Sequence, residues 1–154
     1  DTYIYSIRIL NCIKYEIDIK EAIKYLKIGA DKHHADSSYE LADILYNGYY
    51  TAKMNKTEAA KYYKIAADGC NINSMLVYAE MLNSGEGILI DNLEALTYYK
   101  KAADNDNVNG MYTYAYLSFN GKGIPVNKED AAKYFKMAAD RDHSNSMFNY
   151  CLFE

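Results

Sequence analysis

The chain contains 154 residues, half of them hydrophobic and a quarter charged, and its formal net charge at pH 7 is −4. This length is sufficient for one domain with a buried core, and the acidic balance argues against a nucleic-acid-binding protein, which would carry a basic surface. No uninterrupted apolar stretch approaches the roughly 18–20 residues that a membrane-spanning helix requires, so a membrane span is excluded.

A short sequence pattern recurs along the chain and divides it into repeats. The tripeptide Ala-Ala-Asp occupies residues 66–68, 102–104 and 138–140, one copy every 36 residues, and Gly-Ala-Asp at 29–31 is a weaker copy. An aromatic pair or its remnant precedes each copy, and an acidic residue followed by alanine lies further ahead. These anchors keep one register, which is typical of a repeat array. The repeats that they define are 1–36, 37–73, 74–109 and 110–145, followed by a partial repeat, 146–154.

Each repeat is predicted to contain two helices. In the first helix, apolar and small residues follow the i, i+3, i+4, i+7 spacing of an amphipathic helix. These positions are Ser38, Leu41, Ala42 and Leu45, then Met75, Tyr78, Ala79 and Leu82, then Met111, Tyr114, Ala115 and Ser118. A glycine-containing turn should end this helix, because glycine adopts a positive φ without a steric penalty. The second helix is expected from about Thr57 to Asp68, with a stripe made of Ala59, Tyr62, Tyr63 and Ala66.

The turns between the helices contain residues that suit helix ends. The N-caps of the second helices are expected to be Asp18, Asn55, Asp91 and Asn127. Turn hydrogen bonds, rather than metal binding, are expected for His34, Asn71, Asn107 and His143. A left-handed conformation is expected in these turns at Lys32, Gly69, Asn105 and Arg141. Asn tolerates it, but it costs Lys or Arg about 1 kcal/mol, so the three turns without Gly should be slightly less stable or differently closed. Local turn hydrogen bonds are also expected for Asp31, Asp68, Asp104 and Asp140.

The packing of the helices follows from their length. Two helices of about 12 residues cannot bury their own apolar stripes, so neighbouring repeats must stack and cover them. The alternation of Ala with Tyr supports this packing, since Ala lets helices approach closely and Tyr fills the remaining space. The predicted fold class is all-α, an α/α superhelix (solenoid) of helix-turn-helix repeats. Residues 1–154 would form a single solenoid domain, which we expect to be a fragment of a longer array.

The best-formed repeat, 74–109, combines aromatic, small and glycine residues in a fixed order. Its pattern consists of Tyr78-Ala79, Gly85, Gly87, Asp91, Ala95, Tyr98-Tyr99 and Ala102-Ala103. This pattern resembles the Sel-one-like repeat, a relative of the tetratricopeptide repeat. Repeat 110–145 matches nearly as well and adds Pro125, whereas repeat 1–36 has Cys12 and Lys14 in place of the loop glycines. The resemblance implies an α/α superhelix that serves as a protein-interaction scaffold or adaptor.

Enzymatic chemistry is not indicated by the sequence. It contains no H-E-x-x-H, G-x-S-x-G or S-x-x-K motif, so we predict no catalytic residue, no cofactor and no metal site. Cys12, Cys70 and Cys151 lie far apart without a C-x-x-C pair, so free buried thiols are expected, which favours a reducing compartment. A cysteine-rich branch of the resembled family has one disulfide per repeat and is linked to β-lactam binding. The cysteine positions therefore disfavour the alternative of a β-lactam-binding enzyme.

Solenoids of this kind bind partners along a concave face lined by the first helices. The residues that the helical spacing places on that face are Glu40, Asp43, Tyr46, Glu80, Asn83, Thr113, Tyr116 and Phe119. This series begins acidic and becomes aromatic, which suits a peptide or protein partner with a basic part and an apolar part. For Tyr116 and Phe119, the alternative is burial against the neighbouring repeat.

Two other kinds of association fit the sequence. One is a structural role in a larger assembly, of viral or host-interaction type, in which the array packs permanently against its neighbours through large surfaces. The other is self-association through an exposed helix in the partial repeat. The apolar residues of that helix are Phe148, Tyr150, Leu152 and Phe153.

Overall fold

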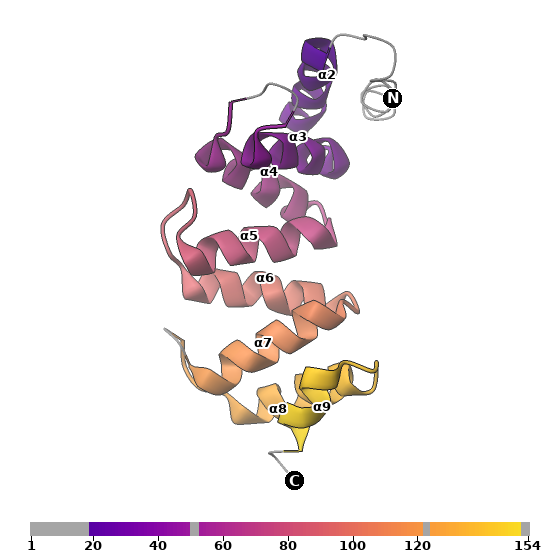
Figure 1. Ribbon diagram of the computed structural model, residues 1–154, viewed down its shortest axis with the longest axis vertical. Helices are drawn as coiled ribbons and strands as arrows, with labels where there is room; N and C mark the ends of the chain where they lie inside the picture. The colour runs from indigo at the N-terminus through magenta and orange to yellow at the C-terminus, as the bar shows by residue number, and fades with distance from the viewer. Residues whose placement is uncertain (1–18, 50–52, 122–123, 152–154) are drawn as a thin grey trace. The chain divides into compact units, whose positions relative to one another are not determined.

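The computed structural model describes residues 19–49, 53–121 and 124–151, which form eight α-helices and no strand (Figure 1). The helices are α2 (Ile19–Asp31), α3 (Ala35–Asn47), α4 (Lys56–Asp68), α5 (Ile72–Ser84), α6 (Asn92–Asp104), α7 (Val108–Asn120), α8 (Lys128–Ala139) and α9 (Ser144–Tyr150). The predicted all-α class is confirmed, and α4 lies within one residue of its predicted bounds. Among these helices, none has the length and apolar character needed to cross a membrane.

The helices belong to two compact units. The first unit contains α2, α3, α4, the part of α5 up to Tyr78, and residues Glu86–Leu89. The second contains the rest of α5, from Ala79, and the helices α6 to α9. Within the first unit, α3 contacts both α2 and α4; within the second, α7 contacts α6 and α8, and α8 also contacts α9. Helices adjacent in the sequence are thus packed together, as repeat stacking requires.

The predicted apolar stripes form the core of each unit. In the first unit, Leu41 of α3 and Tyr63 of α4 are almost fully buried. In the second unit, Met111 of α7 and Phe135 of α8 are buried to the same degree. Leu45, predicted to be in the stripe of α3, is half-buried. Complete burial of a side chain such as Leu or Met contributes about 1.5–3 kcal/mol, so these stripes supply the main stabilisation of the helix pairs.

The second helices begin at the predicted N-caps. The side chains of Asn55, Asp91 and Asn127 accept hydrogen bonds of 2.9–3.1 Å from backbone N–H groups in the first turn. The backbone N–H of each cap also donates to a carbonyl of the preceding first helix, at 2.8–3.0 Å. Each such cap contributes about 1 kcal/mol and fixes the direction in which the loop enters the second helix. The fourth predicted cap, Asp18, lies outside the described residues.

Three of the four residues predicted to form turn hydrogen bonds before the first helices do so. Asn71, Asn107 and His143 accept a backbone N–H from the residue three positions later, at 2.8–3.2 Å. His34 occupies the same place ahead of α3, but its side chain makes no capping hydrogen bond. His143 therefore acts at a helix start in the same way as Asn71 and Asn107.

The left-handed residue after each second helix lies one position later than predicted. Gly69 has a φ of −82° and Asn105 a φ of −95°, so neither is left-handed. The residues with φ between 59° and 67° are His33, Cys70, Asp106 and Asp142. The predicted penalty at Lys32 and Arg141 was therefore wrong, because neither residue has a positive φ.

The small residue pair at the end of each second helix, Ala-Ala in three of them and Gly29-Ala30 in α2, closes this turn. In α4, the N–H of Cys70 donates to the carbonyl of Ala67 (3.1 Å), and the N–H of Asn71 donates to that of Ala66 (3.0 Å). These two bonds form a Schellman motif, which satisfies carbonyls that the helix end leaves free. Equivalent pairs of bonds follow α2, α6 and α8. All four turns are thus closed by the same hydrogen bonds.

Asp104 has a partner other than the predicted one. The hydroxyl of Tyr134 in α8 donates to Asp104 Oδ1 at 2.6 Å, and Lys100 Nζ donates to the same hydroxyl oxygen at 3.2 Å. The expected local turn hydrogen bond was wrong for this residue, which instead joins its own repeat to the next. Asp68, by contrast, forms an ion pair with Lys64 of its own helix, at 3.8 Å.

Two glycines are required by the local geometry. Gly48 follows α3 with a φ of 70°, and its N–H donates to the carbonyl of Ile44 at 2.9 Å, which confirms the predicted glycine turn. Gly110 lies where α7 meets α6. A Cβ at this position would lie 2.8 Å from the backbone nitrogen of Ala103 and 2.9 Å from the Cβ of Ala102. The Ala-Ala pair therefore also permits the close approach of these two helices.

Candidate functional site

The eight predicted partner-binding residues lie on three first helices and are called here the first-helix face. Their positions are Glu40, Asp43 and Tyr46 on α3, Glu80 and Asn83 on α5, and Thr113, Tyr116 and Phe119 on α7. The first three belong to the first unit and the other five to the second. The structure thus places the face in two parts, and each part has its own chemistry.

On α3, a carboxylate is surrounded by tyrosines. Asp43 Oδ1 accepts hydrogen bonds from the hydroxyl of Tyr63 (3.3 Å) and from Asn47 Nδ2 (3.0 Å). The rings of Tyr39 and Tyr46 lie 6.2 Å and 6.0 Å from the ring of Tyr63. Burial, with the negative charge of Asp43 as the next cause, raises the pKa of Tyr63, so its hydroxyl stays protonated and remains a donor.

Glu40 lies one turn before Asp43 and shares its negative charge. Its side chain is half-buried, and its pKa is raised first by burial, then by the charges of Asp43 and Asp36. Three acidic residues on one helix therefore repel one another. A cationic group brought by a partner would relieve this repulsion, so the α3 part of the face suits Lys or Arg side chains.

Tyr46 is held by a loop of its own unit. Its hydroxyl donates to the carboxylate of Glu86, which also forms an ion pair with Lys56. The Lys56 ammonium lies 4.9 Å from the centre of the Tyr46 ring, a cation–π contact. Hydrogen bonds from Lys56 and then Tyr46 lower the pKa of Glu86, which remains an acceptor. Tyr46 is therefore engaged within its own unit, as Asp43 is by Tyr63 and Asn47.

On α7, the face is an open aromatic surface. Tyr116 is 49% exposed and stacks on Tyr112, with ring centres 6.1 Å apart and an interplanar angle of 29°. Tyr112 also contacts the rings of Phe135 (5.9 Å) and His143 (4.7 Å). Phe119 is half-buried, and the ammonium of a lysine in α8 lies 6.0 Å from its ring centre. Tyr116 is thus an aromatic side chain with one free side and a packed support behind it.

The remaining residues of the face are polar. Glu80 on α5 is exposed, and its charge adds to burial, the larger cause, in raising the pKa of Tyr99 to about 12. Asn83 is half-buried, and its Oδ1 has no hydrogen-bond partner in the part of the chain that the structure describes. Thr113 on α7 is half-buried. Glu80 therefore offers a charge to a partner, whereas the Oδ1 of Asn83 is buried beneath the surface.

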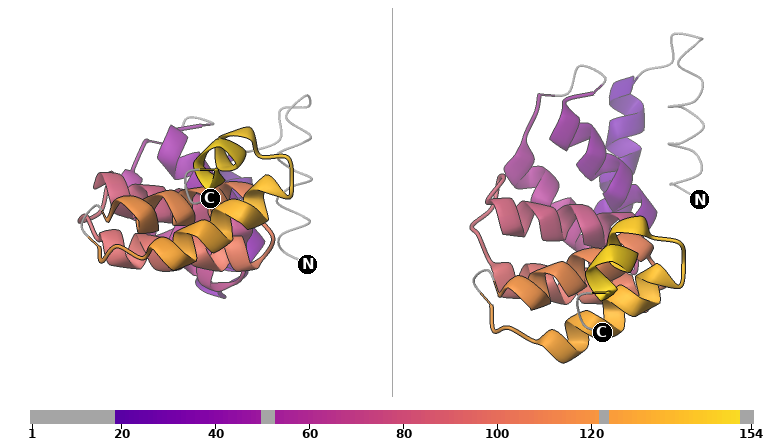
Figure 2. Two further views of the ribbon diagram at one scale, coloured as in Figure 1. Left: turned by 90° about the horizontal axis from the view of Figure 1, so that it is seen from below. Right: turned by 60° about the horizontal axis from the view of Figure 1, so that its bottom comes forward.

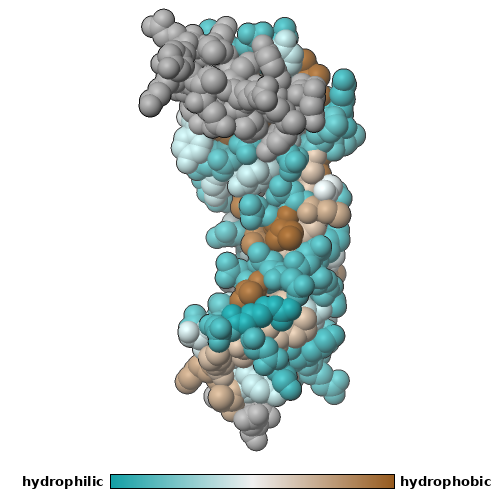
Figure 3. Space-filling view, turned by 90° about the vertical axis from the view of Figure 1, so that its right-hand side faces the viewer, coloured by the Kyte–Doolittle hydropathy of each residue, from teal (hydrophilic) through white to brown (hydrophobic). Residues whose placement is uncertain are grey.

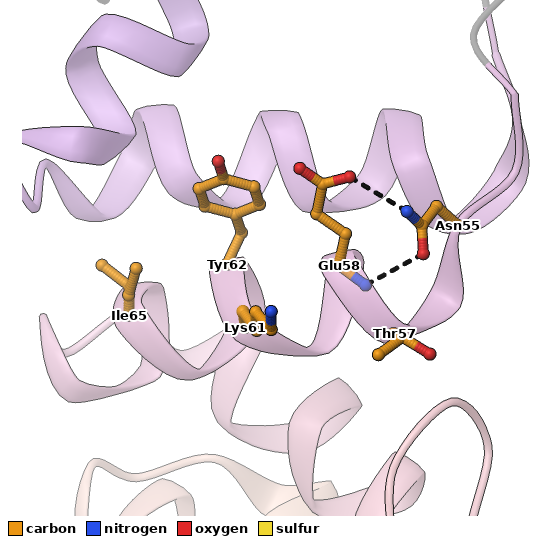
Figure 4. Close-up of a pocket in the computed structure, with 6 residues that line it drawn as sticks. All are labelled: Asn55, Thr57, Glu58, Lys61, Tyr62 and Ile65. Atoms are coloured by element: carbon orange, nitrogen blue, oxygen red, sulfur yellow. Dashed lines mark hydrogen bonds between the residues drawn. The ribbon is translucent and has the colours of Figure 1, made fainter.

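A hollow of about 380 Å³ lies along α4, away from these residues. Figure 4 shows the side chains that line it, which are Asn55, Thr57, Glu58, Lys61, Tyr62 and Ile65. Asn55 and Glu58 are fixed by reciprocal hydrogen bonds, from Glu58 N–H to Asn55 Oδ1 and from Asn55 Nδ2 to Glu58 Oε2. This capping box satisfies helix N–H groups, so its carboxylate has a structural role.

A second hollow, of about 170 Å³, lies on the same helix. It is lined by Thr57, Ala60, Lys61, Lys64, Tyr78, Gly87 and Ile88. None of the eight predicted residues lines either hollow. The sequence of the second helices indicates only packing elements, and no motif in α4 marks a depression. On the side of the molecule shown in Figure 3, hydrophobic residues form small separate patches within a mainly hydrophilic surface.

The thiols and acidic groups show no arrangement for metal binding. Over residues 19–49, 53–121 and 124–151, no three His, Cys, Asp or Glu side chains come together in a way that could hold a metal ion. Cys70 and Cys151 are free thiols, but both are exposed, so the prediction of buried thiols was wrong for them. Cys70 is exposed because it occupies a turn, and Cys151 because it follows α9. Cys12 lies outside the described residues.

Comparison with known families identifies the repeat. The family model described as Sel1 repeat matches the chain four times, at residues 12–34, 35–69, 72–107 and 108–143. These matches cover most of the chain, and the last three coincide with the helix pairs α3–α4, α5–α6 and α7–α8. No curated protein sequence matches the chain.

Solved structures share the fold. A protective antigen of uropathogenic Escherichia coli with an SLR fold matches 97% of this chain with a TM-score of 0.82, and a Sel1 repeat protein from Oxalobacter formigenes matches 95% with a TM-score of 0.74. Cysteine-rich protein B of Helicobacter pylori matches 86% with a TM-score of 0.60 and is itself covered to 95%. All three are 21% identical to this chain, which spans 32% and 59% of the lengths of the first two.

Proposed function

Because the chain belongs to the Sel1 repeat family, we propose that it is a non-catalytic scaffold or adaptor that binds a protein or peptide partner through its first-helix face. Proteins built from these repeats generally serve as scaffolds for protein interactions and generally lack enzymatic activity. The finer part of the proposal, which concerns the residues and the chemistry of the partner, rests on the side chains of α3 and α7.

The exposure of Tyr116 is the observation that carries the proposal. An aromatic side chain that is half-exposed and supported from behind by Tyr112 loses little conformational entropy when a partner covers it. Such residues are enriched among those that dominate binding energy at protein interfaces. Tyr112 is in turn held by Phe135 and His143, so the support is rigid. The α7 part of the face is therefore suited to an apolar or aromatic residue of the partner.

The α3 part of the face supplies the complementary charge. Glu40 and Asp43 repel each other on a half-buried surface, so a cation that approaches them gains more than it would at an isolated exposed carboxylate. The partner suited to these two parts has a basic segment for α3 and an apolar segment for α7. Because the basic segment would be attracted over several ångströms, association should slow as salt is added.

The test compares the chain with two variants of equal charge change. One carries Glu40→Lys, Asp43→Lys and Tyr116→Ala; the control carries Glu129→Lys, Asp140→Lys and Tyr49→Ala. Glu129 and Asp140 are exposed acids, and Tyr49 is 50% exposed, close to the 49% of Tyr116. Both variants are first shown by circular dichroism to retain the helical content of the chain. Each protein is then used to capture partners from a lysate of the source cells, quantified by mass spectrometry.

Specific partners should be captured by the chain and by the control variant, and their recovery should fall about tenfold or more with the first-helix variant. Fragments of a captured partner should then bind the chain directly, more weakly at high salt than at low salt. Equal capture by all three proteins would overturn the assignment of the face, and binding by an acidic rather than a basic fragment would overturn the assigned chemistry.

A further inference from the structure

Helix α9 repeats the sequence of α7 but not its burial. Equivalent positions, 36 residues apart, are Met111 and Met147, Tyr112 and Phe148, Tyr114 and Tyr150, and Ala115 and Cys151. Met111 is fully buried, whereas Met147 is 42% exposed. Cys151 is likewise exposed, although Ala115 is fully buried, and Phe148 is 71% exposed. The side of α9 formed by Met147, Phe148, Tyr150 and Cys151 is called here the open side.

The opposite side of α9 is packed as it is in α7. Ser146 is fully buried, and Gly110 at the equivalent position of α7 is also buried. His143 caps α9 in the way that Asn107 caps α7, by accepting a backbone N–H three residues later. Helix α9 contacts α8, beside which it lies in Figures 1 and 2, just as α7 contacts α6. Helix α9 is therefore docked in the register of a first helix.

In α7, the side equivalent to the open side is covered by α8. The ring of Tyr114 meets that of Tyr134 edge-on, with centres 4.7 Å apart, and its hydroxyl donates to Asp130 Oδ2 at 2.9 Å. The ring of Tyr112 lies 5.9 Å from that of Phe135. A covering helix thus supplies an adjacent aromatic pair, together with a carboxylate one turn earlier.

We propose that the open side of α9 is a docking surface for a partner helix that carries the stripe of α8, Asp-Ala-x-x-Tyr-Phe-x-x-Ala. The occupant follows from continuity with the α7–α8 interface, because α9 presents equivalent side chains in the same order. Phe148 receives the partner's Phe, and Tyr150 receives its Tyr and donates its hydroxyl to the partner's carboxylate. Cys151 lies beneath the partner's small residues. None of these four residues belongs to the first-helix face, so this surface is separate from that of the proposed function.

The test uses Cys151 as a reporter of docking. The probe is a synthetic peptide with the sequence of residues 126–141, acetylated and amidated at its ends, added to the whole chain. The rate at which maleimide modifies each cysteine is followed by mass spectrometry. Docking should slow the modification of Cys151 by about fivefold or more at saturating peptide, because bound peptide covers the thiol. Cys70, which is exposed in the other unit, should react at an unchanged rate and serves as the internal reference.

Two variants and a control peptide make the result specific. Met147→Glu with Phe148→Glu in the chain should weaken peptide binding, measured by the anisotropy of a labelled peptide, by about tenfold or more. A peptide in which Ser replaces the residues equivalent to Tyr134 and Phe135 should give no protection. Tyr116→Ala in the chain should leave peptide binding unchanged. This control distinguishes failure of the α9 proposal from failure of the proposed partner binding by the first-helix face.

Three results would overturn the proposal. One is an unprotected Cys151 at millimolar peptide, and another is equal protection by the Ser-containing peptide. The third is a dimer of the chain, seen by light scattering, that protects Cys151 without peptide and is lost in the Met147→Glu, Phe148→Glu variant. In that case a second copy of the chain, and not a helix of the α8 type, would cover α9.

Discussion

The α3–α4 pair of the first unit and the α7–α8 pair of the second have the same backbone plan but different chemistry at their contact. Asp43 and Tyr116 occupy equivalent positions on the two first helices, and Tyr63 and Phe135 occupy equivalent positions on the two second helices. In the first pair, the Tyr63 hydroxyl donates to the Asp43 carboxylate. In the second, Phe135 has no hydroxyl, and its ring contacts Tyr112, which supports the half-exposed Tyr116.

This difference indicates which positions the repeat constrains. Ala66 and Ala138 are equivalent, and both are fully buried, because a larger side chain would separate the packed helices. The contact at Asp43 and at Tyr116 lies nearer the surface, where either a hydrogen bond or an aromatic stack maintains the packing. Variation at such positions changes what a partner meets without changing the fold. Under the proposed function, the first-helix face would therefore be where repeats of one family acquire different partners.

Removal of the aromatic ring from the second pair should have the largest effect. Phe135→Ala is expected to lower the free energy of unfolding by about 3–5 kcal/mol, because a fully packed ring is replaced by a cavity. Urea unfolding followed by circular dichroism measures it. Phe148→Ala is the matched control, since that ring is 71% exposed, and should change stability by less than about 0.5 kcal/mol. Equal effects of the two substitutions would show that Phe135 does not form part of the core.

A smaller loss is expected at a close helix contact of the second unit. Gly110→Ala should lower the free energy of unfolding by about 1–3 kcal/mol, because the new methyl group would press against the backbone of Ala103 and the side chain of Ala102. Ala favours a helix over Gly by about 1 kcal/mol, so the sign is decided by the clash. The same unfolding measurement tests this, and an increase in stability would mean that α6 and α7 separate without penalty.

The equivalent position in the first unit should respond with the opposite sign. Ser37 is fully buried, and its hydroxyl has no hydrogen-bond partner within the described residues. Ser37→Ala should therefore raise the free energy of unfolding by about 0.5–1 kcal/mol, since a buried unpaired hydroxyl is unfavourable. Ser74, at the same repeat position, has the same unpaired hydroxyl, and Ser74→Ala should behave alike. A loss of stability in both variants would reveal a bound water as the missing partner.

The sequence predicted the fold well because periodic patterns record burial directly. The stripes around Leu41 and Met111 and the caps at Asn55 and Asp91 were all found by their spacing. The left-handed conformation was predicted one residue too early because glycine is the residue that most readily adopts a positive φ. Gly69 is small for a different reason: a Cβ at this position would lie 2.7 Å from the Cβ of Ala35. In this turn, Gly69 permits the close contact and Cys70 adopts the positive φ. The sequence alone does not show which of two neighbouring residues has which role.

Contacts between repeats were harder to predict than contacts within them. The bond from Tyr134 to Asp104 joins residues 30 positions apart, and no local pattern marks it. For the same reason, spacing on α3 placed Tyr46 on the first-helix face but did not show that Glu86 binds its hydroxyl. The hollow lined by Glu58 and Lys61 was missed because it depends on the shape of the surface around α4. Helical spacing assigns a residue to a face, and the packing of loops decides what else it meets.

The smallest expected effect concerns the acidic surface of the first unit. The pKa of Glu40 is raised in the folded chain, so the ionised carboxylate disfavours folding. This penalty is absent below the unfolded-state pKa and develops as the pH rises through the folded-state pKa. Glu40→Gln should therefore raise the free energy of unfolding by a few tenths of a kcal/mol at neutral pH and have no such effect at about pH 3.5. Urea unfolding at both pH values measures the difference.

A double-mutant cycle identifies the source of this effect. After burial, the charge of Asp43 contributes more than that of Asp36 to raising the pKa of Glu40, so the benefit of Glu40→Gln at neutral pH should shrink in an Asp43→Asn background. If the benefit instead stays the same at both pH values and in both backgrounds, the gain comes from packing of the amide, and the α3 surface holds no repulsion for a cationic partner to relieve. On α7, the residue equivalent to Asp43 is Tyr116, which has no charge. Charge repulsion between the positions of Glu40 and Asp43 therefore occurs on α3 and not on α7.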